Sequence, residues 1–244
     1  MTLTRAYARV EALQLLRVPV YAFSTLAFPV AGLVLFGQQF VDGEPERALA
    51  GFAATAVLAI GFFQFGVGIA ADRMYKWETY LRTLPAGPGA RIAGRVLCAL
   101  GFSIAAVASV TVAAVVLYDA RPSPWRAGVL IVALALGGVP FALLGLALGY
   151  WLPPRAALPG ANLLFLPLVL GGFLWSRPPD DIPHDADVAS QLLPTRSWEE
   201  VLDPIATGDG PVPWHHVAAL VAWAAAFGAL AWWGYRRDEG ERFT

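Results

Sequence analysis

Charged residues are scarce in this chain. Only 14% of its 244 residues are Asp, Glu, Lys or Arg, 57% are hydrophobic, and the mean hydropathy is +0.58. Because soluble domains usually carry about 25% charged residues, the composition excludes an ordinary soluble domain and indicates an integral membrane protein. The net charge of −1 gives no electrostatic reason to expect a nucleic-acid partner. The length is that of one membrane domain, which we expect to cover residues 1–244.

Cysteine and lysine are nearly absent, and several kinds of site are excluded with them. The single cysteine, Cys98, cannot close an internal disulfide. The ATP-binding motif GxxxxGK[ST] needs a lysine, and the single lysine, Lys76, is followed by Trp77. The motifs GxSxG, HExxH and CxxC are also missing. We therefore expect no catalytic residue, no metal site and no cofactor on this chain.

Six apolar runs are each about as long as the roughly 20 residues that a helix needs to cross a membrane. They cover residues 18–36, 48–71, 96–118, 127–152, 156–176 and 214–235. None has an Asp, Glu, Lys, Arg or His in its central part. Transporters that use an ion or proton gradient usually keep such residues at mid-membrane. The sequence therefore argues against a transporter that powers itself.

Basic residues are unevenly distributed between the segments that join these runs. With six spans, both termini lie on one side, together with segments 72–95 and 153–155. That side holds 12 of the 17 basic residues, so the positive-inside rule predicts cytoplasmic N- and C-termini. The preference for Arg over Lys and the abundance of Ala fit a bacterium with GC-rich codons. We expect a multi-pass protein of the bacterial cytoplasmic membrane, in contact with its lipid.

The stretch DRMYKWETYLRTLPAGPGAR, residues 72–91, is a charged island between the second and third runs. Acid-first i,i+4 pairs favour a helix over about 72–84, and Pro85 ends it. The helix has one apolar face at regular spacing, made of Met74, Trp77, Leu81 and Leu84. Two interpretations stand at this point: a helix that rests on lipid headgroups, or a docking element for a cytoplasmic partner.

Two further polar segments carry helical patterns. In residues 1–17, Leu3, Tyr7 and Val10 form a stripe opposite Arg5 and Arg9, which predicts an amphipathic helix on the cytoplasmic surface. The acidic loop 177–213 has a capping box of Ser197 and Glu200, which predicts a short helix from Trp198. For His184 beside Asp180 and Asp181, a solvated acidic loop is favoured over a metal site.

Uncharged polar and small residues inside the runs point to helix packing. Gln64 and Asn162 are suited either to bond across a helix interface or to line a pathway. Gly145 and Gly149 form a GxxxG pattern in the fourth run, which is a weak indication of close helix approach.

This order of elements resembles the permease subunit of type-2 ABC exporters. The text ADRMYKWETYLRTLPAGPGARIAGRVLCAL (71–100) is similar to the family segment in which an acid–Arg pair leads a short helix that carries a Glu and reaches Leu-x-x-x-Pro. The texts LPGANLLFLPLVLGGFLW (158–175) and LLPTRSWEEVL (192–202) resemble the family's fifth span and outer region. The family often has a Glu after the Arg and then Gly-Thr, where this chain has Met74, Lys76 and Trp77.

The resemblance implies an all-α fold with six transmembrane helices, an N-terminal amphipathic helix, a coupling helix between spans 2 and 3, and an extracellular helical segment between spans 5 and 6. It implies a non-catalytic subunit that assembles with a second permease, either a copy or a homologue, and with two ATPase subunits that bind ATP and magnesium. The residues implied to dock on the ATPase are Arg73, Met74, Lys76, Trp77, Glu78, Leu81 and Arg82. Those implied to line a cargo pathway or dimer interface are Ser24, Thr25, Phe28, Asn162 and Phe165.

The expected cargo follows from the uncharged membrane runs. Because these runs hold no fixed charge to bind a polar ion, we expect a hydrophobic or amphipathic cargo such as a lipid, drug or antibiotic. The alternative is a membrane-embedded structural or assembly protein that recruits a cytoplasmic partner through residues 72–84. ATP-dependent flux of a cargo distinguishes the two.

Overall fold

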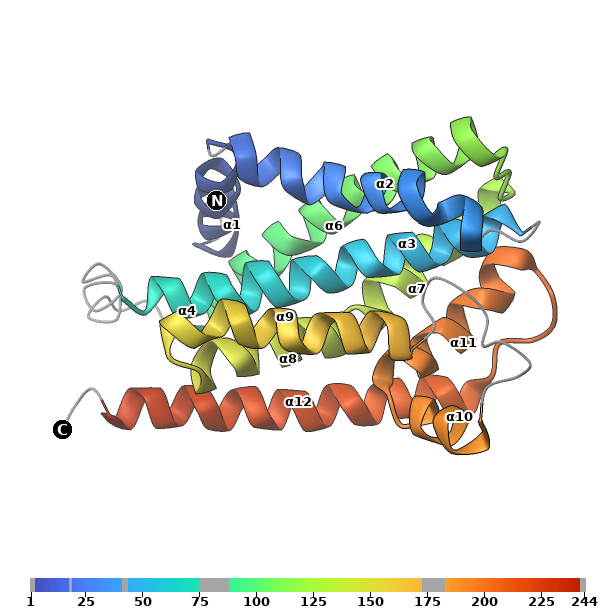
Figure 1. Ribbon diagram of the computed structural model, residues 1–244. Coiled ribbons are helices and arrows are strands. Elements are labelled where there is room, and N and C mark those ends of the chain that lie inside the picture. The colour runs from blue at the N-terminus through green and yellow to red at the C-terminus, as the bar shows by residue number, and fades with distance from the viewer. Residues whose placement is uncertain (1–2, 18, 41–43, 75–87, 173–182, 242–244) are drawn as a thin grey trace.

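The computed structural model describes residues 3–17, 19–40, 44–74, 88–172 and 183–241, and every element in these ranges is a helix. The helices form a layered bundle in which most lie roughly along one direction (Figure 1). The N-terminal helix and the C-terminal end of the chain lie at the same end of this bundle, which we call the base. The opposite end, which we call the far end, carries α10 and α11.

In the part of each apolar run that the structure describes, the chain is helical apart from single residues at breaks and ends. The corresponding elements are α2 (Pro19–Phe40), α3, η1 and α4 in sequence (Pro45–Ala59, Ile60–Val67, Gly68–Asp72), α6 (Pro88–Tyr118), α7 with α8 (Pro124–Gly137, Val139–Trp151), α9 (Pro154–Gly171) and α12 (Trp214–Glu241). Five of these helical stretches are long and apolar enough to cross a membrane, and a shorter apolar helix, Thr25–Gly37, lies within α2. The all-helical membrane fold is therefore confirmed.

The helix starts differ from the expected ones by a few residues, and proline explains several of the shifts. α3, α7 and α9 begin at Pro45, Pro124 and Pro154. Proline suits the first position of a helix because its fixed φ angle is helical and its missing N–H would have had no partner there. At α7, the hydroxyl of Ser123 also accepts a hydrogen bond from the backbone N–H of Arg126 (3.4 Å) and caps the helix.

The second span is the centre of the bundle. It is the most deeply buried of the five long spans. Its α3 part packs against α2 and α6, whereas its η1 part packs mainly against α8 and α9. α12 packs along α8 and forms an outer layer (Figure 1). Gln64 in η1 donates from Nε2 to the Cys98 Sγ on α6 (3.7 Å), so it bonds across a helix interface.

Glycines let η1 and α8 come unusually close. A Cβ atom on Gly145 would overlap the carbonyl oxygen of Gly61, and one on Gly149 would lie 2.8 Å from the carbonyl oxygen of Gly66. The GxxxG pattern therefore does mark a close helix contact. η1 is a π-helix of eight residues, a wide backbone form that is found mainly in single turns and often at functional positions.

Replacing one of these glycines tests the seam directly. We expect Gly145→Ala to destabilise the protein by about 1–3 kcal/mol, the usual effect of overpacking, because the new methyl group meets backbone that cannot move aside. The measurement is thermal unfolding of the purified protein in detergent.

The matched control is Gly128→Ala in α7, where an added Cβ has no atom within 4 Å. This variant should be neutral or up to about 1 kcal/mol more stable, since alanine favours a helix over glycine. Equal melting temperatures for the two variants would contradict the close packing of η1 on α8.

Helices outside the membrane spans cover both ends. α1 (Leu3–Leu16) lies across α6 at the base, where a Cβ on Gly94 would meet the Cβ of Tyr7 at 2.6 Å. Leu3 and Val10 are exposed, so the predicted stripe is divided between a protein-facing Tyr7 and two outward residues. The predicted amphipathic helix at the N-terminus is confirmed as an element.

At the far end, α10 (His184–Gln191) and α11 (Pro194–Thr207) follow one another. The prediction that the second of these begins at Trp198 is wrong, because α11 begins at Pro194 with proline in its first turn. Ser197 is therefore not a cap. Its buried hydroxyl lies 3.3 Å from Nδ1 of His216 on α12. α11 packs against α3, α7 and α12 and closes the far end of the bundle.

Candidate functional site

Arg73 joins three helices at the base. It follows α4 directly, and its Nη1 donates to the carbonyl oxygens of Gly149 (2.9 Å), Tyr150 (3.1 Å) and Leu152 (3.2 Å). On the other side, its Nε and Nη2 contact Oδ1 of Asp238 on α12 at 2.9 and 2.6 Å. The side chain therefore links the end of α4 to the ends of α8 and α12.

The position of Arg73 satisfies two groups that are costly to leave alone. The last carbonyls of a helix have no partner within it, and a cation at a helix C-terminus also favours the helix dipole. The Asp238 side chain is only 4% exposed, and a buried carboxylate needs a paired cation. One guanidinium group meets both needs because it has five donors in a fixed plane.

Arg95 on α6 makes a second junction beside the first. Its Nε donates to Oε1 of Glu11 on α1 at 3.1 Å, and its Nη2 contacts Oδ2 of Asp72 at the end of α4. We call Glu11, Asp72, Arg73, Arg95 and Asp238 the base cluster. It ties α4 to α1, α6, α8 and α12.

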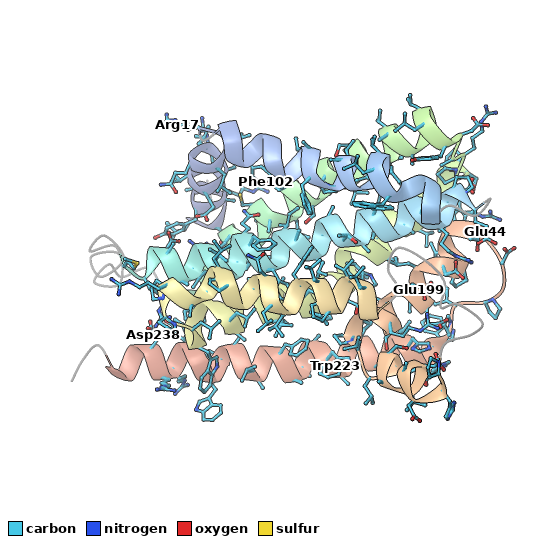
Figure 2. All side chains as sticks on the ribbon, viewed as in Figure 1. Arg17, Glu44, Phe102, Glu199, Trp223 and Asp238 are labelled. Carbon is cyan, nitrogen blue, oxygen red and sulfur yellow. The ribbon has the colours of Figure 1, made fainter. Side chains whose placement is uncertain are left out.

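The base cluster includes the start of the segment predicted as a coupling helix, residues 72–84. Asp72 and Arg73 are its first two residues, and α6 begins at Pro88 after it. Figure 2 places the labelled Asp238 and Arg17 at this end, and Glu44 and Glu199 at the far end. The predicted docking residues Lys76, Trp77, Glu78, Leu81 and Arg82 lie outside the described residues.

The two described docking candidates point in different directions. Met74 is 68% exposed and is free to meet a partner. Arg73, in contrast, is turned into the protein, with its side chain 16% exposed and bonded within the chain. The spacing along a helix gave no indication of this, because the partners of Arg73 come from residues 76 to 165 positions away in sequence.

The five pathway candidates are not brought together within one chain. Phe28 on α2 is 60% exposed, and Asn162 on α9 is also exposed, so both face outward. Thr25 is half-buried, and the side chain of Ser24 lies outside the described residues. Phe165 is buried within the chain, with its ring centre 5.5 Å from that of Phe63 and 6.3 Å from that of Phe62. It is a packing residue between α9 and η1.

Trp198, which the sequence indicated only as the start of a helix, fills a break in the fourth span. The fourth span breaks at Gly138, between α7 and α8, with Pro140 two residues later. The fully buried Trp198 of α11 fills this break, where it stacks on Phe141 with ring centres 5.0 Å apart and touches the Cα side of Gly137. The Gly-Gly-x-Pro sequence was the available signal, since such residues interrupt helices.

Aromatic and cationic side chains hold α8 to α12 near the base. Nε1 of Trp151 donates to the carbonyl oxygen of Leu230 at 3.0 Å, and the Arg237 guanidinium lies 5.5 Å from the Trp151 ring centre. Arg236 lies over Trp232 at 4.7 Å. Tryptophan and arginine together are typical of the edge of a bilayer, where an apolar ring and a charged group are both satisfied.

Comparison with known proteins agrees with this architecture. Residues 2–195 match the sequence profile of the ABC-2 type transporter family. The chain belongs to the ABC-2 type transporter family. This ABC-2 protein is also 22% identical over 238 residues to the Bacillus subtilis (strain 168) protein named "Putative transport permease YvfS". The alignment covers 94% of this chain and 95% of that one. It is thus a multi-pass membrane permease of a transporter.

The base cluster makes a direct stability prediction. Arg73→Gln should destabilise the permease by roughly 3–5 kcal/mol, since it removes the guanidinium group that contacts the buried Asp238. The melting temperature of the protein in detergent should fall accordingly.

Arg236→Gln is the matched control, because Arg236 lies on α12 at the same end but is exposed. Losing its contact with the Trp232 ring should cost about 0.5–1 kcal/mol at most. An Arg73→Gln protein as stable as this control would show that the buried junction contributes little.

Proposed function

We propose that this chain is the membrane subunit of an ATP-driven exporter and that it receives mechanical work from a separate ATPase through residues 72–84. The observation that carries the proposal is that the base cluster holds the start of this segment, Asp72 and Arg73, together with Arg95 on α6, the helix that follows it. A docking element can move a bundle only if its ends are joined to the helices that must move.

The contacts of the base cluster supply those joints. A displacement of residues 75–87 pulls on Arg73, and through it on the ends of α8 and α12. The same displacement acts through Asp72 on Arg95, and so on α6 and α1. Charged hydrogen bonds of this kind are among the stronger non-covalent links, so four neighbouring helices respond to one segment.

The roles of the predicted docking residues divide accordingly. We assign Arg73 to anchoring within the chain. Contact with the ATPase, which would bind the ATP and magnesium, is assigned to Met74, Lys76, Trp77, Glu78, Leu81 and Arg82. The base then faces the cytoplasm with both termini, as the distribution of basic residues in the sequence predicts, and the membrane is the bacterial cytoplasmic membrane.

A second permease, either a copy or a homologue, is proposed to meet this one along the outward faces of α2 and α9. Phe28 and Asn162 are exposed on these two helices. α2 and α9 pack against different parts of the same central span. With Ser24 and Thr25, they would border the space between two permeases, whereas Phe165 would support α9 from inside.

The proposed cargo is hydrophobic or amphipathic. In the described residues, charged side chains of the spans lie near the two ends of the bundle, and the length between them carries no charged residue. Figure 2 shows the same separation, with Phe102 and Trp223 between the charged ends. A membrane route without fixed charge favours molecules that already partition into lipid.

Co-purification tests the docking proposal. We expect an ATP-hydrolysing subunit to accompany the chain from its native membrane in mild detergent. The double variant Trp77→Ala/Arg82→Glu should lose this subunit while remaining inserted and folded.

The control is Trp232→Ala/Arg236→Glu, which makes the same two changes at exposed positions of α12 and should keep the ATPase. If no ATPase binds, or if it survives the change at 77 and 82, the docking proposal is wrong. If an ATPase binds but no ATP-dependent flux of a fluorescent phospholipid or lipophilic dye follows in vesicles, the assembly-protein alternative is favoured.

A further inference from the structure

A compact group of charges joins the start of α3 to α11 at the far end. Arg47 contacts Oδ1 of Asp203 through Nε and Oε2 of Glu44 through Nη1, both at 2.5 Å. Arg196 contacts Oε2 of Glu199 at 2.8 Å and Oε1 of Glu200 at 2.5 Å. We call these residues the far-end cluster: Glu44, Arg47, Arg196, Glu199, Glu200 and Asp203.

Among the residues that the structure describes, the far-end cluster has four carboxyl groups for two guanidinium groups. Arg47, Arg196 and Glu199 are each less than a tenth exposed, so little water reaches this part of the cluster. Excess negative charge is costly under these conditions. Glu199 is the most enclosed of the four acids, whereas Glu44 and Glu200 have side chains 40% and 35% exposed. Glu199 also shares its guanidinium partner with Glu200.

A small pocket separates α3 from α11 beside Glu199. It is lined by Arg47, Ala50, Gly51, Glu199, Leu202 and Asp203. Nη2 of Arg47 is buried and has no hydrogen-bond partner among the described residues. The contact between these two helices therefore includes an incompletely paired polar part, next to the apolar core that both helices share.

We infer that Glu199 is the proton-binding residue of a latch that holds α11 against α3, with α11 docked when Glu199 is protonated and loosened when it is ionised. The latch matters for the fourth span because α11 carries Trp198 into the break at Gly138. A change in the docking of α11 would therefore release or hold the first residues of α8.

The electrostatics support the latch. Burial raises the pKa of Glu199 to about 8; Arg196 acts against this rise, Glu200 and Asp203 add to it, and Arg47 opposes it. When α11 separates from α3, water reaches Glu199 and its pKa returns toward the ordinary value of 4.5. Docked α11 then holds a proton that separated α11 has lost. Docking must therefore weaken as pH rises between these two values and level off above the higher one.

Charged groups on the other helices around α11 are alternative sources of a pH response. α12 offers His215 and His216, and α7 offers Arg126, which donates to the carbonyl oxygen of Thr207 at 2.9 Å. On α10, His184 and Asp185 are exposed, and Asp187 accepts from Gln191. In the described part of α9 the ionisable residue is Arg155, at the opposite end. His216 is the main competitor, but a proton on it would be partly buried beside His215, with Glu200 offsetting this only in part, and so would loosen α11 at low pH, which is the opposite sign.

Hydrogen exchange across pH tests the latch in the intact permease. The protection factors of the backbone amides of residues 198–206, corrected for the intrinsic pH dependence of exchange, should fall by about tenfold or more between about pH 6 and pH 8. The variant Glu199→Gln, which keeps the shape of a protonated glutamate, should remain protected with no such fall.

Two controls separate Glu199 from its neighbours. Glu200→Gln and His216→Gln should both retain the fall in protection seen in the parent protein. The inference is overturned if the parent protein shows constant protection of α11 across this range, a result that needs no variant. It is equally overturned if the pH response survives in Glu199→Gln or disappears in His216→Gln.

Discussion

The structure depends on one side chain at its base. Arg73 lies where α4, α8 and α12 end together, and its guanidinium group is bonded to three backbone carbonyls and to a buried aspartate. Because Arg73 and Asp238 are largely buried, little water reaches these helix ends and charges, so their partners come from the protein itself. Arg73 supplies them at the point where the segment proposed to dock on an ATPase leaves the bundle.

α8 carries the effect of this junction toward the far end. It is held at the base by Arg73, along its length by the glycines that face η1, and at its start by Trp198 of α11. Glycine contacts leave little room for sideways movement between η1 and α8, so these two elements are expected to move as a unit. A pull at the base is then felt at the break in the fourth span, where α11 is fixed by a cluster with its own dependence on pH.

Much of the fold could be predicted from the sequence because membrane spans are encoded locally. An apolar run of about 20 residues is sufficient to indicate a spanning helix, and the described part of each run forms helix. Three features were harder to predict from the sequence: the break at Gly138, the π-helical form of η1 and the start of α11 at Pro194. The first two depend on how neighbouring helices pack, and at the third a capping box on Ser197 competed with the stronger effect of proline.

The candidate site could be predicted from the sequence only in part. The charged island at 72–91 and its amphipathic pattern are visible in sequence, but the direction of one side chain within it is not. Arg73 and Arg95 find their acidic partners 165 and 84 residues away, in α12 and α1. The burial of Phe165 against η1 could not be predicted from the local sequence either, because it follows from contacts between helices. Pairings of this kind are decided by the tertiary fold.

The central claim is that Arg73 and Asp238 act as one buried pair that joins α4 to α12. The measurement that tests it most directly is a double-mutant cycle with Arg73→Gln, Asp238→Asn and both changes together, read as unfolding free energy in the same detergent. Strong coupling is predicted: the double variant should lose clearly less stability than the sum of the two single losses, by about 1 kcal/mol or more, because each single change already removes the interaction between the two groups. Additive losses would contradict the claim and would leave the coupling segment without its link to α12.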